Sequence, residues 1–98
     1  MDIVFAGTKL RKLCTERRRA ARTLGPECAG RLGQRLDELR AASALEVMRR
    51  LPGRCHELRG DRAGQLSLDL VHPARLLFVC ASEPPPSKPD GGLDWARV

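Results

Sequence analysis

A histidine and several arginines lie close together in the second half of the chain, and their residue types could cleave RNA. His56, Arg59 and Arg62 recur at every third residue, and Arg75 opens the next apolar run. Cleaving RNA without a metal requires a base for the ribose 2′-hydroxyl, cations for the charge that develops at the phosphate, and an acid for the leaving oxygen. Guanidinium groups supply the cations and favour the neutral imidazole that can act as a base. The spacing indicates a phosphodiester-cleaving site, although a histidine beside arginines is more often an ordinary surface feature.

The other residues that could carry chemistry indicate structural roles. Zinc ligands usually come in closely spaced pairs, whereas the cysteines of this chain are far apart in sequence: Cys14, Cys28, Cys55 and Cys80. We expect them to be reduced and to serve as small apolar residues. His72 precedes a proline and is interpreted as a solvated turn residue, and the acidic residues show no metal-binding spacing. The sequence therefore predicts neither a metal nor a cofactor.

Alternation of apolar and polar residues predicts the sheet that would position the candidate groups. Residues 65–70 alternate throughout, which is typical of a strand with one solvated and one buried face. Residues 55–58 form a candidate strand before it, joined through the turn at residues 60–64, and residues 2–5 indicate a short opening strand. Residues 76–81 are apolar on both faces, so we expect them to form the central strand.

Apolar residues at helical spacing predict helices ahead of this sheet. The first helix should span residues 8–24 with Thr8 as its N-cap, and Gly25-Pro26 should end it and begin a second helix. The second helix carries an apolar stripe of Cys28, Leu32, Leu36 and Leu39. We expect the two helices to form an antiparallel hairpin packed on one face of the sheet. Residues 43–46 match a capping box for a short third helix, which Leu51-Pro52-Gly53 should end.

Length and charge limit the function. The 98 residues carry 18 Lys+Arg against 12 Asp+Glu, a formal net charge of +6. A chain of this size forms one domain, and its charge favours a polyanionic partner such as nucleic acid or an acidic protein segment. With no Tyr, one Trp and two Phe, the chain lacks the aromatic surface on which RRM-type and cold-shock-type proteins stack bases. No stretch resembles a membrane span or a signal peptide, so we expect a cytoplasmic protein.

The end of the chain changes character once more. Residues 82–98 begin as a loop rich in Pro and Gly and continue as an incomplete C-terminal segment around Trp95. We expect the final strand of the sheet to be missing, which leaves an edge open to a partner. The predicted fold class is α+β, with an antiparallel sheet and an N-terminal helical hairpin on one face, in a single domain of residues 1–98.

Two segments resemble a known protein family. Residues 56–64 read His-Glu-Leu-Arg-Gly-Asp-Arg-Ala-Gly, and residues 75–78 read Arg-Leu-Leu-Phe. They are similar to the H-x-L-K/R-G-x-R-x-G hairpin and the R-L-x-F strand of the RelE/ParE superfamily of bacterial toxins. Within it the chain resembles the HigB-like group, a branch of which is sometimes labelled killer suppression protein HigA. The resemblance implies a RelE-like fold and a toxin of a type II toxin-antitoxin system, namely a ribosome-dependent mRNA interferase (endoribonuclease) that inhibits translation.

The same resemblance implies residue roles and partners. His56, Arg59 and Arg75 would be catalytic, and Arg54 and Arg62 would bind RNA. The partners would be the ribosome with its mRNA and a HigA-like helix-turn-helix antitoxin, which would form a hetero-oligomer with the toxin.

The chain departs from the family pattern at two places. Ala74 stands where the family prefers an aromatic residue, and the closing strand with its Asp-Tyr-His-type sequence is absent. The expected activity is that of a metal-independent endoribonuclease if the closing strand is dispensable. The alternatives are a catalytically inactive antitoxin- or RNA-binding protein of the same fold, and a ParE-like gyrase inhibitor.

Overall fold

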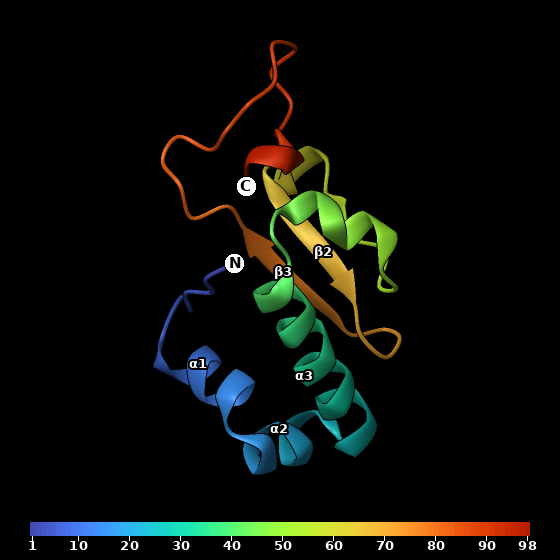
Figure 1. Cartoon of the computed structure of the whole chain (residues 1–98). Helices are drawn as coiled ribbons and strands as arrows, with labels where there is room; N and C mark the ends of the chain where they lie inside the picture. Colours follow the sequence, from blue (N-terminus) through green and yellow to red (C-terminus); the bar gives the residue numbers. More distant parts are fainter.

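A long helix and a three-stranded antiparallel sheet organise the fold, which is α+β as predicted (Figure 1). The computed structural model describes all 98 residues, Met1–Val98. Its elements are the α-helices α1 (Thr8–Thr15), α2 (Arg17–Leu24) and α3 (Pro26–Ala41), the strands β1 (His56–Glu57), β2 (Gln65–Asp69) and β3 (Arg75–Val79), and the 3-10 helices η1 (Leu45–Arg50), η2 (Gly60–Arg62) and η3 (Trp95–Arg97). None of the helices has the length and apolar character needed to cross a membrane.

The first predicted helix is divided in two. Glu16, with φ −105° and ψ 104°, has extended backbone and separates α1 from α2. Just before the break, the Thr15 hydroxyl donates a hydrogen bond of 2.7 Å to the Arg11 carbonyl. Such a bond from a side chain back to the preceding turn competes with the regular helix and tends to bend it. Thr8 is the first residue of α1 and not its N-cap, which is Gly7.

The predicted break at Gly25-Pro26 is confirmed. Gly25 takes a φ of 87°, which favours glycine, and Pro26 is the first residue of α3. α2 packs against α3, whereas α1 buries no residue. The predicted stripe of Cys28, Leu32, Leu36 and Leu39 is buried, but it includes one residue that the pattern did not assign to the core, Arg35.

The sheet is covered differently from the prediction. Its main core contains residues from the C-terminal end of α3, from η1 and from Trp95, together with the inner face of the sheet, and no residue of α1 or α2: Leu39, Ala42, Leu45, Met48, Cys55, Leu66, Leu68 and Trp95. Figure 1 shows α3 and η1 passing over the same side of the sheet, with α1 and α2 beyond the end of the strands. α2 therefore packs against α3 and α1 against α2, and neither of these two helices covers the sheet.

Of the short predicted elements, the opening strand is wrong, whereas the third helix forms and ends at Leu51 as predicted but lacks its capping box. Residues 2–5 form no strand, because the Met1 ammonium group is held at the end of α3, where it donates hydrogen bonds to the carbonyls of Leu39, Arg40 and Ala42. The capping box at residues 43–46 does not form either. η1 begins after Ala44, with no side chain bonded to its first turn, and it is a 3-10 helix.

The strand order is β1-β2-β3, so β2 is central and β3 lies at an edge. The prediction that residues 76–81 form the central strand is therefore wrong. β3 is only half-covered: Leu76 and Phe78 pack on the core, whereas Leu77 and Val79 are exposed. β1 is shorter than the predicted 55–58. The strand predicted from the alternation of residues 65–70 is confirmed as β2, but its predicted solvated face is wrong, because Ser67 is buried as fully as Leu66 and Leu68.

The opposite face of the sheet, here called the outer face, carries His56, Ser67 and Leu77 side by side. The register pairs His56 with Ser67 and Ser67 with Leu77, and directly paired residues point to the same face. Alternation places Asp69 and Arg75 on that face as well, since Asp69 pairs with Arg75 two residues further along the strands. Ser67 is fully buried there, and its hydroxyl has no hydrogen-bond partner.

The C-terminal segment contributes to the core. Residues 82–94 form a loop with one isolated bridge between Ser87 and Leu93. The Trp95 side chain is 4% exposed, and the Arg49 guanidinium lies 3.9 Å from the centre of its ring. The Val98 carbonyl accepts a hydrogen bond of 3.1 Å from the Leu45 backbone N–H. The end of the chain therefore closes the core without adding a fourth strand to the sheet.

Candidate functional site

Charged side chains converge at one end of the outer face, around Asp69. Arg54 donates two hydrogen bonds to this carboxylate, from Nε to Oδ2 at 2.5 Å and from Nη2 to Oδ1 at 3.2 Å. Arg75 is paired with Asp69 across the two strands. This end of the sheet holds two guanidinium groups and one carboxylate.

His56 is fixed next to this cluster with one ring nitrogen available. Its Nδ1 lies 2.6 Å from the carbonyl oxygen of Arg54. A carbonyl can only accept a hydrogen bond, so Nδ1 carries the proton and Nε2 keeps the lone pair of the neutral ring. His56 is thus oriented by the backbone, and Nε2 is the atom that can take a proton from a substrate.

The electrostatics define Asp69 as a counter-ion. The hydrogen bonds and charge of Arg54, with smaller contributions from the charges of His56 and Arg75, lower the pKa of the Asp69 carboxyl below its ordinary value. The same pair raises the pKa of Arg54. Asp69 is therefore ionised and cannot act as an acid at neutral pH. Arg75 has no such partner and presents its charge to solvent.

A tight turn before β1 holds the cluster in place. Gly53 and Arg54 take φ angles of 112° and 50°, and the Gly53 carbonyl accepts a hydrogen bond of 2.7 Å from the Asp69 N–H. Arg35, only 2% exposed, lies beneath the turn and donates from Nε to the Asp69 carbonyl at 3.1 Å and from Nη1 to Glu38 at 3.0 Å. A Cβ atom at Gly53 would lie 2.8 Å from Arg35 Nε. Only glycine fits there, and Arg35 is a positioning residue for the site.

An open hollow of about 370 Å³ adjoins the cluster at this end of the sheet. It is lined by Arg54, Asp69, Leu70, His72, Pro73, Ala74 and Arg75. His72 lies in the turn between β2 and β3 and is exposed, in agreement with its interpretation as a turn residue. The structure adds that this second imidazole borders the same hollow as the two arginines.

Not all of the predicted site residues come together. Arg54, His56 and Arg75 lie near Asp69, whereas Arg59 and Arg62 lie in the hairpin at the other end of β2, where the Leu58 N–H bonds to the Gln65 carbonyl. Four residue steps separate Gln65 from Asp69, which is about 13 Å along the strand. Arg59 and Arg62 therefore lie at the opposite end of β2 from Arg54 and Arg75.

Sequence reasoning missed two residues of this site. In the sequence, Asp69 is one of the polar positions of the alternating run at residues 65–70, and nothing local distinguishes it from the others. Arg35 was not noticed, although it stands within the buried stripe of α3, where an arginine needs a specific partner. That position is the signal that could have identified it.

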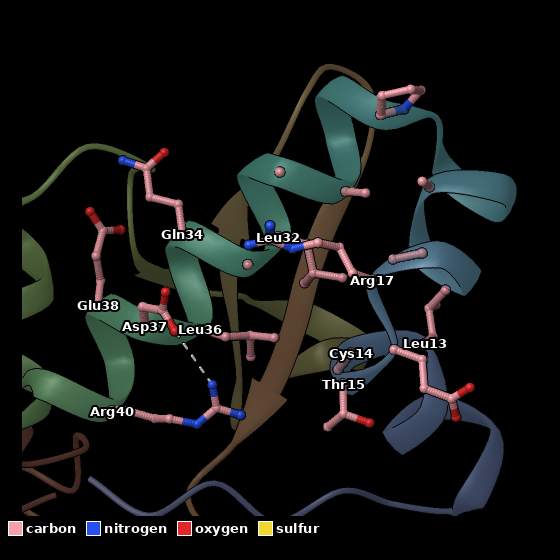
Figure 2. A pocket seen from close by; sticks show the side chains of 17 residues that line it. Leu13, Cys14, Thr15, Arg17, Leu32, Gln34, Leu36, Asp37, Glu38 and Arg40 are labelled. Carbon is pink, nitrogen blue, oxygen red and sulfur yellow. Dashed lines mark ion pairs between the residues drawn. The ribbon is translucent and has the colours of Figure 1, made fainter.

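A second hollow, of about 750 Å³, lies elsewhere, between α3 and the two preceding helices (Figure 2). It contains no histidine, and two of its charged residues, Asp37 and Arg40, form an ion pair with each other at 3.6 Å. Burial raises the pKa of the Cys14 thiol on its wall, so this cysteine is protonated and unreactive at neutral pH. Its cations, Arg17 and Arg40, therefore have no imidazole base beside them, unlike the arginines at the sheet.

No three His, Cys, Asp or Glu side chains are grouped so that they could hold a metal ion, and all four cysteines are free. Comparison with protein-family models, with curated proteins and with solved structures finds no match for this chain. Membership of the RelE/ParE superfamily therefore stays a prediction from the sequence, and the proposal of a function depends on the geometry of the sheet end together with that prediction.

Proposed function

We propose that this protein is the toxin of a type II toxin-antitoxin system, a metal-independent endoribonuclease that cleaves mRNA on the ribosome in the cytoplasm and is neutralised by a helix-turn-helix antitoxin. One observation carries the proposal. The His56 imidazole, with its Nδ1 fixed by the Arg54 carbonyl, lies near Asp69 and its two arginines at one end of the outer face. The resemblance of residues 56–64 and 75–78 to the RelE/ParE toxins supplies the choice of mRNA as the substrate.

The chemistry assigned to these residues is an intramolecular transfer at phosphorus. His56 Nε2 takes the proton of a ribose 2′-hydroxyl, and the 2′-oxygen forms a bond to the adjacent phosphorus as the bond to the 5′-oxygen breaks. The products are a 2′,3′-cyclic phosphate and a 5′-hydroxyl end. Arg75 stabilises the charge on the non-bridging oxygens. The leaving 5′-oxygen takes a proton from solvent or from the His72 imidazolium on the same hollow.

Arg54 has a divided role in this scheme. Its guanidinium is already engaged by Asp69, so it contributes less free charge to a phosphate than Arg75. Its backbone carbonyl, however, sets the tautomer of His56. Arg59 and Arg62 are assigned to a more distant part of the RNA because of their place in the hairpin.

The test is induction of the protein in bacteria, with mapping of mRNA 5′ ends and measurement of growth. Codon-phased cleavage with growth arrest is expected for the wild type. His56→Ala should reduce cleavage about 100-fold or more, as loss of a general base does, and Arg75→Ala should also reduce it. Arg18→Ala removes an equal charge from the exposed face of α2 and is the matched control.

The possible results separate the proposal from its alternatives. Absence of codon-phased ends, or growth arrest that persists in both site variants, contradicts it. DNA-damage signalling without translational arrest indicates a gyrase inhibitor. Tight binding to a co-encoded helix-turn-helix protein without toxicity indicates an inactive binding protein.

A further inference from the structure

The outer face of β3 carries an apolar strip that the fold leaves uncovered. Leu77 is 37% exposed and Val79 is 60% exposed. Both point to the same side as Arg75, because alternate residues of a strand share a face. Scattered apolar residues on a surface need no explanation, but two on one strand in line with a candidate catalytic arginine make a continuous surface.

This strip is bracketed by positive charge. Arg54 and Arg75 lie at one end, and the hairpin with Arg59 and Arg62 lies at the other, about 13 Å away along β2. The acidic residues in these segments are Asp69, which is bound to Arg54, Asp61 in the hairpin, and Glu57, which pairs with Leu66 and so points to the opposite face. The face therefore combines an apolar centre with two cationic ends, which is complementary to an extended polyanion that also has apolar parts.

His56 is level with the strip. The register sets His56, Ser67 and Leu77 in one row across the three strands, so their Cα atoms span about 10 Å. Ser67 between them has no exposed surface, so the part of this row that a ligand can contact consists of His56 and Leu77. A single nucleotide can bridge this row, with its ribose beside His56 and its base on Leu77.

We propose that Leu77 and Val79 form the base-binding surface of a single-stranded RNA that runs along the outer face of β3 with one phosphate at Arg75 and another at the Arg59–Arg62 hairpin. The inference rests on the proposed function and deepens it, because it names the part of the face that holds the substrate. The bases pack on aliphatic side chains and not on aromatic rings. RNA is favoured over an acidic peptide because the row ends at His56, whose Nε2 can accept a hydrogen bond from a ribose 2′-hydroxyl. A peptide has no such hydroxyl in its backbone.

The experiment measures binding of the full chain to a short single-stranded RNA carrying 2′-O-methyl groups, which cannot be cleaved by this chemistry. A second probe has the same backbone with abasic residues in its centre. Wild type should bind the intact probe about five- to tenfold more tightly than the abasic probe, which corresponds to burial of about 50 Å² of apolar surface. The double variant Leu77→Asn/Val79→Thr should bind both probes equally. Leu10→Asn, at a leucine of similar exposure on the distant helix α1, should keep the preference.

The outcomes distinguish this inference from the function on which it rests. Equal binding of both probes by wild type overturns the base-binding surface, even if mRNA is still cleaved. A base preference that depends on Leu77 and Val79 supports the surface, even if His56→Ala shows that cleavage has another cause. Failure to bind RNA, with Leu77-dependent binding of an acidic amphipathic peptide, overturns the inference in favour of a protein partner.

Discussion

Replacement of Gly53 by alanine tests the packing that holds the site together. The new Cβ would lie 2.8 Å from Arg35 Nε and 3.1 Å from Leu68 Cδ2, at a residue whose φ is 112°. The backbone term costs about 1–2 kcal/mol, and crowding of a packed interior costs about 1–3 kcal/mol. Arg35 cannot move away easily, because its Nε and Nη1 are bonded to Asp69 and Glu38. We therefore expect Gly53→Ala to destabilise the fold by about 2–5 kcal/mol.

Urea unfolding followed by circular dichroism measures this loss. With an m-value of about 1–1.5 kcal/mol/M for a chain of this size, the midpoint should fall by about 2 M. Two glycines provide controls. Gly60→Ala, at a φ of 66° but with open space around its Cβ, isolates the backbone term. Gly33→Ala, in α3 with open space and ordinary backbone, should stabilise the helix by about 0.5–1 kcal/mol.

The Gly53→Ala substitution should also change the orientation of His56 in the candidate site. If Arg35 or the turn shifts, the hydrogen bond between the Arg54 carbonyl and His56 Nδ1 weakens, and the ring loses its fixed tautomer. Nitrogen chemical shifts of the imidazole report this directly. A Gly53→Ala protein that is no less stable than Gly60→Ala, with an unchanged His56 tautomer, would refute the reasoning that buried Arg35 fixes this turn.

Four further predictions address the rest of the molecule. The pKa of Asp69 is lowered below its ordinary 3.8 by Arg54, so its contribution is present above that value and is lost as the pH falls through the lowered pKa. Asp69→Asn should therefore flatten the acid limb of a plot of stability against pH. Trp95→Ala should lower the free energy of unfolding by about 3–5 kcal/mol in calorimetry, because it empties a core position. Ser67→Ala removes a buried hydroxyl without a partner and should raise the free energy of unfolding, measured in urea, by about 1 kcal/mol. A loss of stability would show that the hydroxyl has a partner in solution. Burial raises the pKa of the Cys55 thiol to about 11, so this cysteine should resist a thiol reagent at pH values well below 11 until the protein is unfolded with denaturant, and rapid reaction of the native protein would contradict its burial.

Elements set by local sequence could be predicted. The alternation of residues 65–70 identifies β2, and Gly25-Pro26 identifies the start of α3. Each depends on a pattern within a few residues, such as a period of two or a fixed φ. The apolar stripe on α3 could also be predicted from local sequence, since helical periodicity indicates which side of the helix is buried.

Properties set by distant contacts could not be predicted. An apolar run such as that of β3 indicates a central strand only if both faces are covered, and the sequence does not say that nothing covers Leu77 and Val79. The site shows the same limit. The types and spacing of His56 and Arg75 could be recognised, but the register of β2 against its neighbours separates Arg59 from Arg75 and brings in Asp69. Arg35 belongs to the site only because Gly53 lies above it.

The closure of the core by Trp95 and Val98 affects the order in which the chain can fold as it is made. α2 and α3 are neighbours in sequence and can associate once residue 41 has left the ribosome. The sheet core has to wait, because Leu45 and Arg49 meet Val98 and Trp95 only after some fifty further residues have been added. Such long-range contacts form slowly. Until then the inner faces of β2 and β3 lack their cover, so a nascent chain that stalls in the 82–94 loop exposes its apolar strands to chaperones and to other unfolded chains.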